Sequence, residues 1–182
     1  MKLTRRGFLN ISTAAAVVCA ATLLPVEKAA AAQQTMAAQE LLEQAYLYAF
    51  PLVLMDATRK VSTNTETPND TRAPINQFIH AKKLADAASR AVVTPNVDTI
   101  YTQAFLDVSA EPMLYGVPQT DRFFNVQVLD AWTNTVAVLE APGLYAITRS
   151  DWQGKLPEGV QRINVPTNMV WTIARIVLSG QE

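Results

Sequence analysis

Apolar residues recur at three- and four-residue spacing early in the chain. Between Thr35 and about Phe50 they fall on neighbouring helical turns, and an apolar stretch then continues to about Lys60. This period is that of an α-helix with an apolar stripe. Pro51 interrupts the pattern, so the sequence predicts either a kink at this residue or a second helix with Pro51 in its first turn.

The period then changes. Residues 62–74 hold Ser, Thr, Asn, Asp and two prolines without apolar periodicity, which predicts a loop, and the alanine-rich segment 81–89 predicts a short helix. Alternation of apolar and polar positions follows, separated by turn-forming residues. It predicts strands at 98–108, 122–129, 133–140, 143–148, 161–165 and 169–178. Helices followed by a run of strands indicate an α+β fold with a mostly antiparallel sheet or sandwich.

The N-terminus has the features of an export signal. Residues 4–9, Thr-Arg-Arg-Gly-Phe-Leu, match the twin-arginine pattern. The uncharged run 11–24 is shorter than the ~20 apolar residues of a spanning helix, and four alanines at 29–32 offer small-residue cleavage sites. We therefore expect a signal peptide at 1–32, a single domain at 33–182, and a periplasmic or secreted location. An uncleaved N-terminal anchor is the alternative.

Removal of the signal changes the charge of the chain. The whole chain has 15 basic and 16 acidic residues, and the signal contains four of the basic ones and one of the acidic ones. The mature chain therefore has 11 basic and 15 acidic residues, a net charge of −4 with His80 neutral. A mildly acidic domain lacks the basic face that nucleic acids require, and it has no polybasic segment for anionic membranes. We expect no nucleic-acid partner and no stable membrane anchor after cleavage. The single cysteine, Cys19, lies in the signal, so no disulfide is expected.

Polar side chains gather where the first long strand is expected to begin. Pro95 favours an extended Thr94, and Asn96 and Asp98 are residues that hydrogen-bond local backbone in turns. One hypothesis is that Asn96, Asp98 and Tyr101 face a ligand, with Asp98 as an acid or base. The alternative is a structural turn in which Asn96 and Asp98 satisfy backbone groups.

A second polar cluster accompanies the strand at 122–129. Gln127 is polar within an otherwise apolar strand, and Asp130, Trp132 and Asn134 follow at its end. In a pocket wall the amides would orient a ligand, the indole would cover it and the carboxylate would handle protons. The alternative is a solvated strand face followed by an Asp/Asn turn.

Two single residues are further candidates. His80, the only histidine, would act as a base if Asp98 or Asp130 oriented it, and otherwise it is a surface histidine. Arg175 is a lone charge in an apolar strand, where it could bind an anion, pair with Asp107 or Asp130, or face solvent. The mature chain has no cysteine and one histidine, so we expect no metal and no cofactor.

Several segments together resemble the bacterial family called domain of unknown function 1254. They are Ala45–Val53, Asn76–His80, Val92–Tyr101, Leu106–Pro112, Phe124–Asn134 and Pro166–Arg175. The resemblance covers nearly the whole mature chain and transfers no catalytic residue. It implies a two-part protein, in which a jelly-roll-like part from the companion family numbered 1214 follows. The chain ends at Glu182 without that part, so we expect either a fragment or a separate companion polypeptide.

Two classes of function fit these patterns. The first is an exported binding or assembly module for a small molecule or for the companion. The second is an enzyme that uses Asp98 and Asp130, with or without His80, for acid–base chemistry on a small polar or envelope-derived substrate. If the companion normally covers the sheet, exposed apolar groups near Trp171 and Ile173 should promote self-association.

Overall fold

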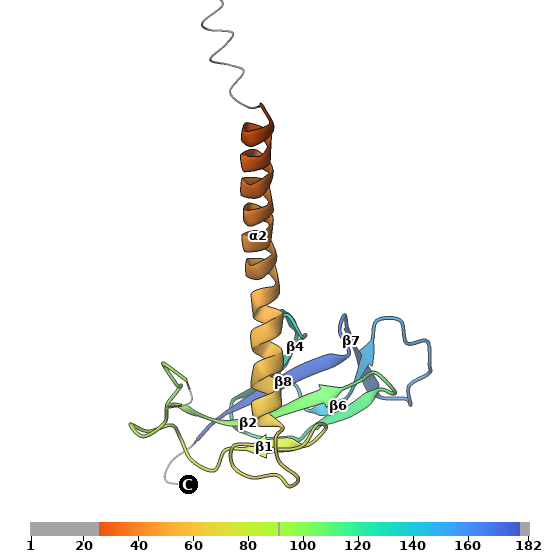
Figure 1. Ribbon diagram of the computed structural model, residues 1–182. Helices are drawn as coiled ribbons and strands as arrows, with labels where there is room; N and C mark the ends of the chain where they lie inside the picture. The colour runs from red at the N-terminus through yellow and green to blue at the C-terminus, as the bar shows by residue number, and fades with distance from the viewer. Residues whose placement is uncertain (1–25, 91, 179–182) are drawn as a thin grey trace, which may run out of the picture. The chain divides into compact units, whose positions relative to one another are not determined.

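The computed structural model describes residues 26–90 and 92–178. The chain divides into two units, Met1–Ala49 and Phe50–Glu182, and helix α2 (Val26–Ser62) contributes residues to both (Figure 1). The predicted signal lies largely outside the described residues, and positions 26–32 are the first residues of α2. No helix in the described ranges combines the length and the apolarity needed to cross a bilayer.

Helix α2 is a single element that runs through Pro51. Its sequence is rich in Ala, Leu, Glu and Gln, which are strong helix formers. The last turn contains Arg59 and Lys60, whose charge is favourable at a helix C-terminus. The amide and the hydroxyl of Thr63 both donate to the Arg59 carbonyl, at 2.8 and 2.9 Å, and so satisfy a carbonyl of that turn. The expected helix is therefore present, and Pro51 does not start a second one.

The strands form two sheets (Figure 1). The larger sheet has the order β1-β2-β8-β4-β5, with every neighbouring pair antiparallel. Its strands are β1 (Phe78–His80), β2 (Thr99–Asp107), β8 (Met169–Val177), β4 (Phe124–Leu129) and β5 (Thr135–Leu139). The smaller sheet has the order β3-β6-β7, with β3 (Met113–Val117), β6 (Gly143–Arg149) and β7 (Val160–Val165).

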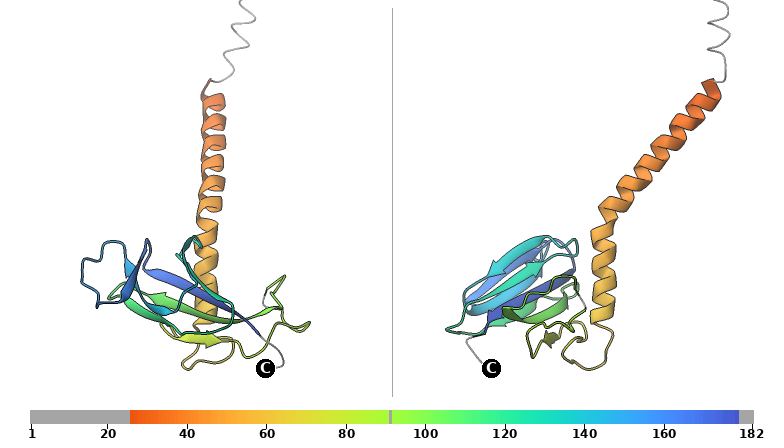
Figure 2. Two further views of the ribbon diagram at one scale, coloured as in Figure 1. Left: turned by 180° about the vertical axis from the view of Figure 1, so that it is seen from behind. Right: turned by 90° about the vertical axis from the view of Figure 1, so that its left-hand side faces the viewer.

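The hydrophobic core lies between the two sheets, which face each other in Figure 2. One face of the larger sheet supplies Ala104, Val128 and Val170, all with no exposed area, and the smaller sheet supplies Tyr145 and Ile147. We call this side of the larger sheet the inner face and the opposite side the outer face. Alternation along each strand assigns every residue to one face. The predicted α+β fold with a mostly antiparallel sandwich is confirmed.

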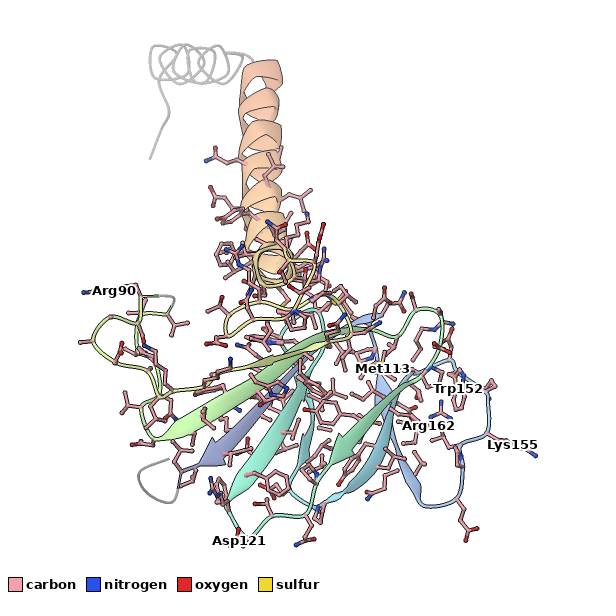
Figure 3. The ribbon with its side chains drawn as sticks, turned by 90° about the horizontal axis from the view of Figure 1, so that it is seen from below. Arg90, Met113, Asp121, Trp152, Lys155 and Arg162 are labelled. Atoms are coloured by element: carbon pink, nitrogen blue, oxygen red, sulfur yellow. The ribbon has the colours of Figure 1, made fainter. Side chains whose placement is uncertain are left out.

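Strands β6 and β7 are the one parallel pair among the described strands. The loop that connects them is held by Arg162, which lies beside Trp152 (Figure 3). The guanidinium carbon is 5.1 Å from the centroid of the Trp152 ring, and Nε donates to Thr148 Oγ1 and Asn164 Oδ1 at 3.0 and 2.6 Å. These contacts fix a parallel connection that has no helix between its strands.

The sequence misassigned three short segments. The predicted helix at 81–89 is a loop, because the Asp86 carboxylate accepts the Ala88 amide at 2.9 Å and the Ser89 hydroxyl at 3.2 Å. Such side-chain bonds to nearby backbone compete with helix formation. Strands β1 and β3 were not predicted, since β1 has only three residues and β3 shows no alternation of polar and apolar residues. Both depend on pairing with β2 and β6.

Candidate functional site

The sequence-predicted site residues do not form a single cluster. Asn96 and Asp98 lie in the turn before β2, and Asp130, Trp132 and Asn134 lie in the turn between β4 and β5. Strand parity puts Tyr101, Gln127 and Arg175 on the outer face, and it puts His80 on the inner face. Each group therefore has to be considered separately.

The turn before β2 is organised by Asn96. Its Oδ1 accepts the Asp98 amide at 2.6 Å and the Thr99 amide at 3.2 Å, and Asp98 itself is exposed. This is the local backbone bonding that Asn provides in turns. Asn96 therefore satisfies backbone groups of a structural turn, as the alternative interpretation predicts. The carboxylate of Asp98 lies in solvent.

Asp130 is the buried acidic residue of the β4–β5 turn, with 3% of its surface exposed. Its Oδ1 accepts the amides of Trp132 and Asn134 at 2.8 and 2.9 Å, and its Oδ2 accepts the side-chain amide of Asn134 at 3.0 Å. Thr133 occupies the left-handed region within this turn, with φ 67°. Asp130 and Asn134 therefore act together to close the hairpin.

The polar residues of the outer face contact one another across the strands. Arg175 is the register partner of Tyr101 on β2 and of Asn125 on β4. Its guanidinium carbon is 5.7 Å from the Tyr101 ring centroid, and its Nη1 is 3.5 Å from Asn125 Oδ1. Gln127 Nε2 donates to Thr135 Oγ1 at 2.7 Å. Pairing with Asp107 or Asp130 was one of three alternatives for Arg175, and the contacts it makes here are with a ring and an amide.

His80 lies on the inner face, where β1 pairs with β2. Its Nδ1 is 2.9 Å from Thr102 Oγ1, its register partner, and its ring centroid is 5.6 Å from that of Phe78. Asp98 and Asp130, the partners proposed from the sequence, do not form this hydrogen bond. The alternation of the strand separates His80 from Tyr101 and Arg175 by the thickness of the sheet.

A pocket of about 580 Å³ opens beside His80, between the inner face and the end of β3. We call it the inter-sheet pocket. Phe78 and Tyr115 meet edge to face in its wall, with ring centroids 5.4 Å apart. The residues that line it are Phe78, His80, Thr102, Tyr115, Gly116, Val117, Pro118, Gln119, Thr120, Arg122, Phe124, Val126, Ala174 and Ile176. Apolar walls with a few polar groups are typical of ligand sites.

The ionisable groups of the inter-sheet pocket are cationic or neutral. Arg122 and His80 line it, and its lining contains no Asp or Glu. Burial raises the pKa of the Tyr115 hydroxyl above its usual value, so this group stays protonated at neutral pH. The Thr120 hydroxyl accepts the backbone N–H of Arg122 at 3.1 Å, which orders the loop at the pocket mouth.

A second hollow of about 650 Å³ lies between the Phe50–Ser62 part of α2 and the strand ends at Asp107 and Met169. Its charged groups are engaged within the protein. Asp56 pairs with Arg59 at 2.6 Å, and the hydroxyl and amide of Ser109 hold the pKa of the Asp107 carboxyl below its usual value. Because the inter-sheet pocket combines aromatic and aliphatic walls with a few polar groups, we place the candidate site there.

Sequence reasoning identified only His80 among the pocket residues. Thr102 lies within the predicted strand 98–108. Phe78, Tyr115 and Arg122 carry no signal of their own, because sheet pairing brings their segments together. No group of three His, Cys, Asp or Glu side chains suited to hold a metal ion occurs among the described residues.

Comparison with known proteins gives a family and a likeness to solved structures. Residues 75–182, which contain strands β1 to β8 of the described residues, match the family described as Protein of unknown function (DUF1254). The VPA0106 protein from Vibrio parahaemolyticus is 25% identical, with a TM-score of 0.62 over 78% of this chain and 33% of its own. The chain thus spans about one third of that protein. No curated protein matched. The chain belongs to the DUF1254 family.

Proposed function

We propose that this chain is an exported periplasmic protein that binds a small molecule in the inter-sheet pocket. The observation that carries the proposal is the pocket itself, with about 580 Å³ of space between aromatic and aliphatic walls and with His80, Thr102 and Arg122 in its lining. Volumes of ~300–1,000 Å³ with few polar groups are usual for ligand sites. Export is supported by the twin-arginine pattern at 4–9.

A pocket-filling substitution tests this proposal. Ile176 lines the pocket near the end of β8, so an indole at this position should occupy the binding space. Val177 is the next residue on the same strand, lies on the outer face and is 38% exposed, which makes Val177→Trp the matched control. We expect some compounds to raise the Tm of the wild type by several degrees. The same compounds should raise the Tm of Val177→Trp equally and should leave the Tm of Ile176→Trp unchanged.

The comparison is made by thermal unfolding against a panel of small metabolites. A Tm shift near zero for Ile176→Trp supports the pocket only if its unfolding is cooperative without ligand. Equal ligand shifts in both tryptophan variants would place the ligand elsewhere and contradict the proposal.

We infer an assembly role as a second function, carried by helix α2. Leu41, Leu42 and Leu47 are 66%, 70% and 70% exposed, and together they surround the helix rather than form one stripe. Large apolar side chains that are exposed in such a group are typical of a surface that other protein covers. Two thirds of the VPA0106 protein has no counterpart in this match, and a companion polypeptide of the jelly-roll kind would supply such cover.

Substitution of the three leucines tests the assembly role. Because exposed apolar side chains associate, the mature chain alone should form concentration-dependent oligomers in sedimentation velocity. Changing Leu41, Leu42 and Leu47 to Gln, which also favours helices, should shift the chain toward monomer. Circular dichroism serves as the control for folding. The triple substitution should leave the β-sheet signal of the chain unchanged. A wild type that stays monomeric at high concentration would contradict this role.

The acid–base alternative stays a prediction. It requires Asp98 and Asp130, with or without His80, to act on one substrate. Asp98 lies in the turn before β2, Asp130 closes the β4–β5 turn and His80 contacts Thr102. We therefore propose binding without acid–base chemistry by these residues.

A further inference from the structure

We infer that the ligand of the inter-sheet pocket is an aromatic ring system with few hydrogen-bonding groups, an inference that rests on the proposed function. The first argument is a row of rings in the wall of the pocket. The Phe78 ring centroid lies 5.6 Å from that of His80, with planes 35° apart, and 5.4 Å from that of Tyr115, with planes 78° apart. All three residues line the pocket, and we call them the ring row.

The fold holds the ring row in place without a ligand. Phe78 and His80 are two residues apart on β1 and therefore share the inner face, where they pair with Ala104 and Thr102. Tyr115 comes from β3 of the smaller sheet and is 4% exposed, so it is fixed in the core. Phe78 is 37% exposed and thus retains ring surface that a ligand can cover. A site formed in advance lowers the entropic cost of binding.

The second argument is that the polar side chains of the wall are bonded within the protein. Thr102 Oγ1 is 2.9 Å from Nδ1 of His80, and the side chain of Thr172 hydrogen-bonds the Tyr115 hydroxyl. The Thr120 hydroxyl accepts a backbone N–H of its own loop. A ligand rich in hydroxyl or amide groups would therefore gain few hydrogen bonds for the water that it loses, at a cost for each group. The wall favours a ligand of low polarity.

The loop after β3 can serve one polar substituent of such a ligand. Gln119 lines the pocket and is exposed, so its amide is accessible. Arg122 lines the pocket too, but it already takes part in an interaction within the protein. A single hydroxyl group at the edge of an aromatic body is compatible with this loop.

The third argument is that an aromatic body gains more from these walls than an aliphatic body of the same size. Both would bury apolar area against Val117, Val126, Ala174 and Ile176, which also line the pocket. Only a ring would also extend the edge-to-face and tilted contacts of the ring row, whose electrostatic attraction adds to the effect of buried area. The arrangement therefore selects an aromatic ligand over a saturated one.

The chain offers a matched pair of substitutions. Phe78→Leu removes the central ring of the ring row and keeps an apolar side chain in the wall. Phe123 is 63% exposed and does not line the pocket. Phe123→Leu therefore makes the same chemical change outside the proposed site.

The experiment measures binding of three probes to the mature chain by titration calorimetry. They are 2-naphthol, its saturated analogue decahydro-2-naphthol, and adenosine, which is aromatic but rich in polar groups. We expect 2-naphthol to bind about tenfold more tightly than either of the others, a difference of about 1.4 kcal/mol. Phe78→Leu should remove most of the preference for 2-naphthol over its saturated analogue, whereas Phe123→Leu should keep it.

Several outcomes would overturn the inference. They are equal affinities for 2-naphthol and decahydro-2-naphthol, a preference that Phe78→Leu leaves unchanged, and adenosine binding as tight as that of 2-naphthol. If Phe78→Leu does not unfold cooperatively, Phe124→Leu replaces it, because Phe124 supplies another ring of the lining. The same loss of preference is then expected, and its absence would have the same meaning.

The Ile176→Trp variant separates failure of this inference from failure of the proposed function. If the wild type bound decahydro-2-naphthol or adenosine best and Ile176→Trp did not bind it, the pocket would remain a ligand site and the aromatic inference would fall. Unchanged binding of 2-naphthol by Ile176→Trp would overturn the inference, because the probe would then bind outside the pocket. Failure of all three probes would also overturn it, and the metabolite panel would decide the proposed function separately.

Discussion

Asp130→Ala is expected to lower the free energy of unfolding by about 3 kcal/mol. The carboxylate is 3% exposed and accepts hydrogen bonds from the Trp132 amide and from the amide and side chain of Asn134. Its removal leaves donors in the β4–β5 turn without their acceptor, and donors left unsatisfied in a part-buried turn are costly. Urea unfolding at neutral pH, with an unchanged m-value, would measure the loss.

Asp98→Ala is the matched control, because both carboxylates were predicted as acid–base residues. Asp98 is exposed, so its truncation should change stability by no more than about 0.5 kcal/mol. Asp130→Asn retains one acceptor oxygen and should fall between the wild type and the alanine variant. If Asp130→Ala were as stable as Asp98→Ala, the turn would not depend on this carboxylate, and a catalytic role for Asp130 would gain support.

Phe105→Ala is expected to cost about 4 kcal/mol and to lower the Tm by about 10–15 °C. Phe105 is 1% exposed and stacks on Trp171, with ring centroids 5.5 Å apart and planes 4° apart. Truncation would leave a cavity on the outer face of β2 and remove the stacking contact. Chemical denaturation gives the loss of stability, and near-ultraviolet circular dichroism reports the changed environment of Trp171.

Phe123→Ala serves as the control for this substitution. Phe123 is 63% exposed just before β4, so the same truncation there should leave the Tm almost unchanged. A Phe105→Ala variant as stable as Phe123→Ala would mean that the outer face of β2 does not pack as described.

The longer strands could be predicted because each alternates over five or more residues. Residues 98–108 became β2 and residues 169–178 became β8, with ends that differ by only one residue. Strand β1 could not be predicted because its three residues carry too little period, and β3 could not because Met-Leu-Tyr-Gly-Val shows no alternation of polar and apolar residues. Both are defined by their pairing with β2 and β6. The Ala81–Ser89 helix was wrong because the side-chain bonds of Asp86 override the intrinsic preference of alanine.

The candidate site was harder to predict than the strands. Sequence reasoning selected polar residues next to one another in the chain, such as Asn96 with Asp98 and Asp130 with Asn134, and these satisfy turns. The inter-sheet pocket instead combines residues from β1, β3, β4 and β8, whose pairing spans much of the chain. His80 was named from the sequence, but its partner Thr102 follows from strand register alone.

The sequence by itself determined the local features of this protein: the twin-arginine pattern, the helical period before residue 62, the alternating strands and the mild negative charge. These depend on neighbouring residues, whose chemistry sets local backbone preference and side-chain direction. Only the tertiary structure decided that Asp130 closes a turn, that Arg175 contacts Tyr101, and that Phe78 and Arg122 line one pocket. Strand order and sheet packing bring these residues together, and neither produces a repeating pattern in the amino-acid sequence.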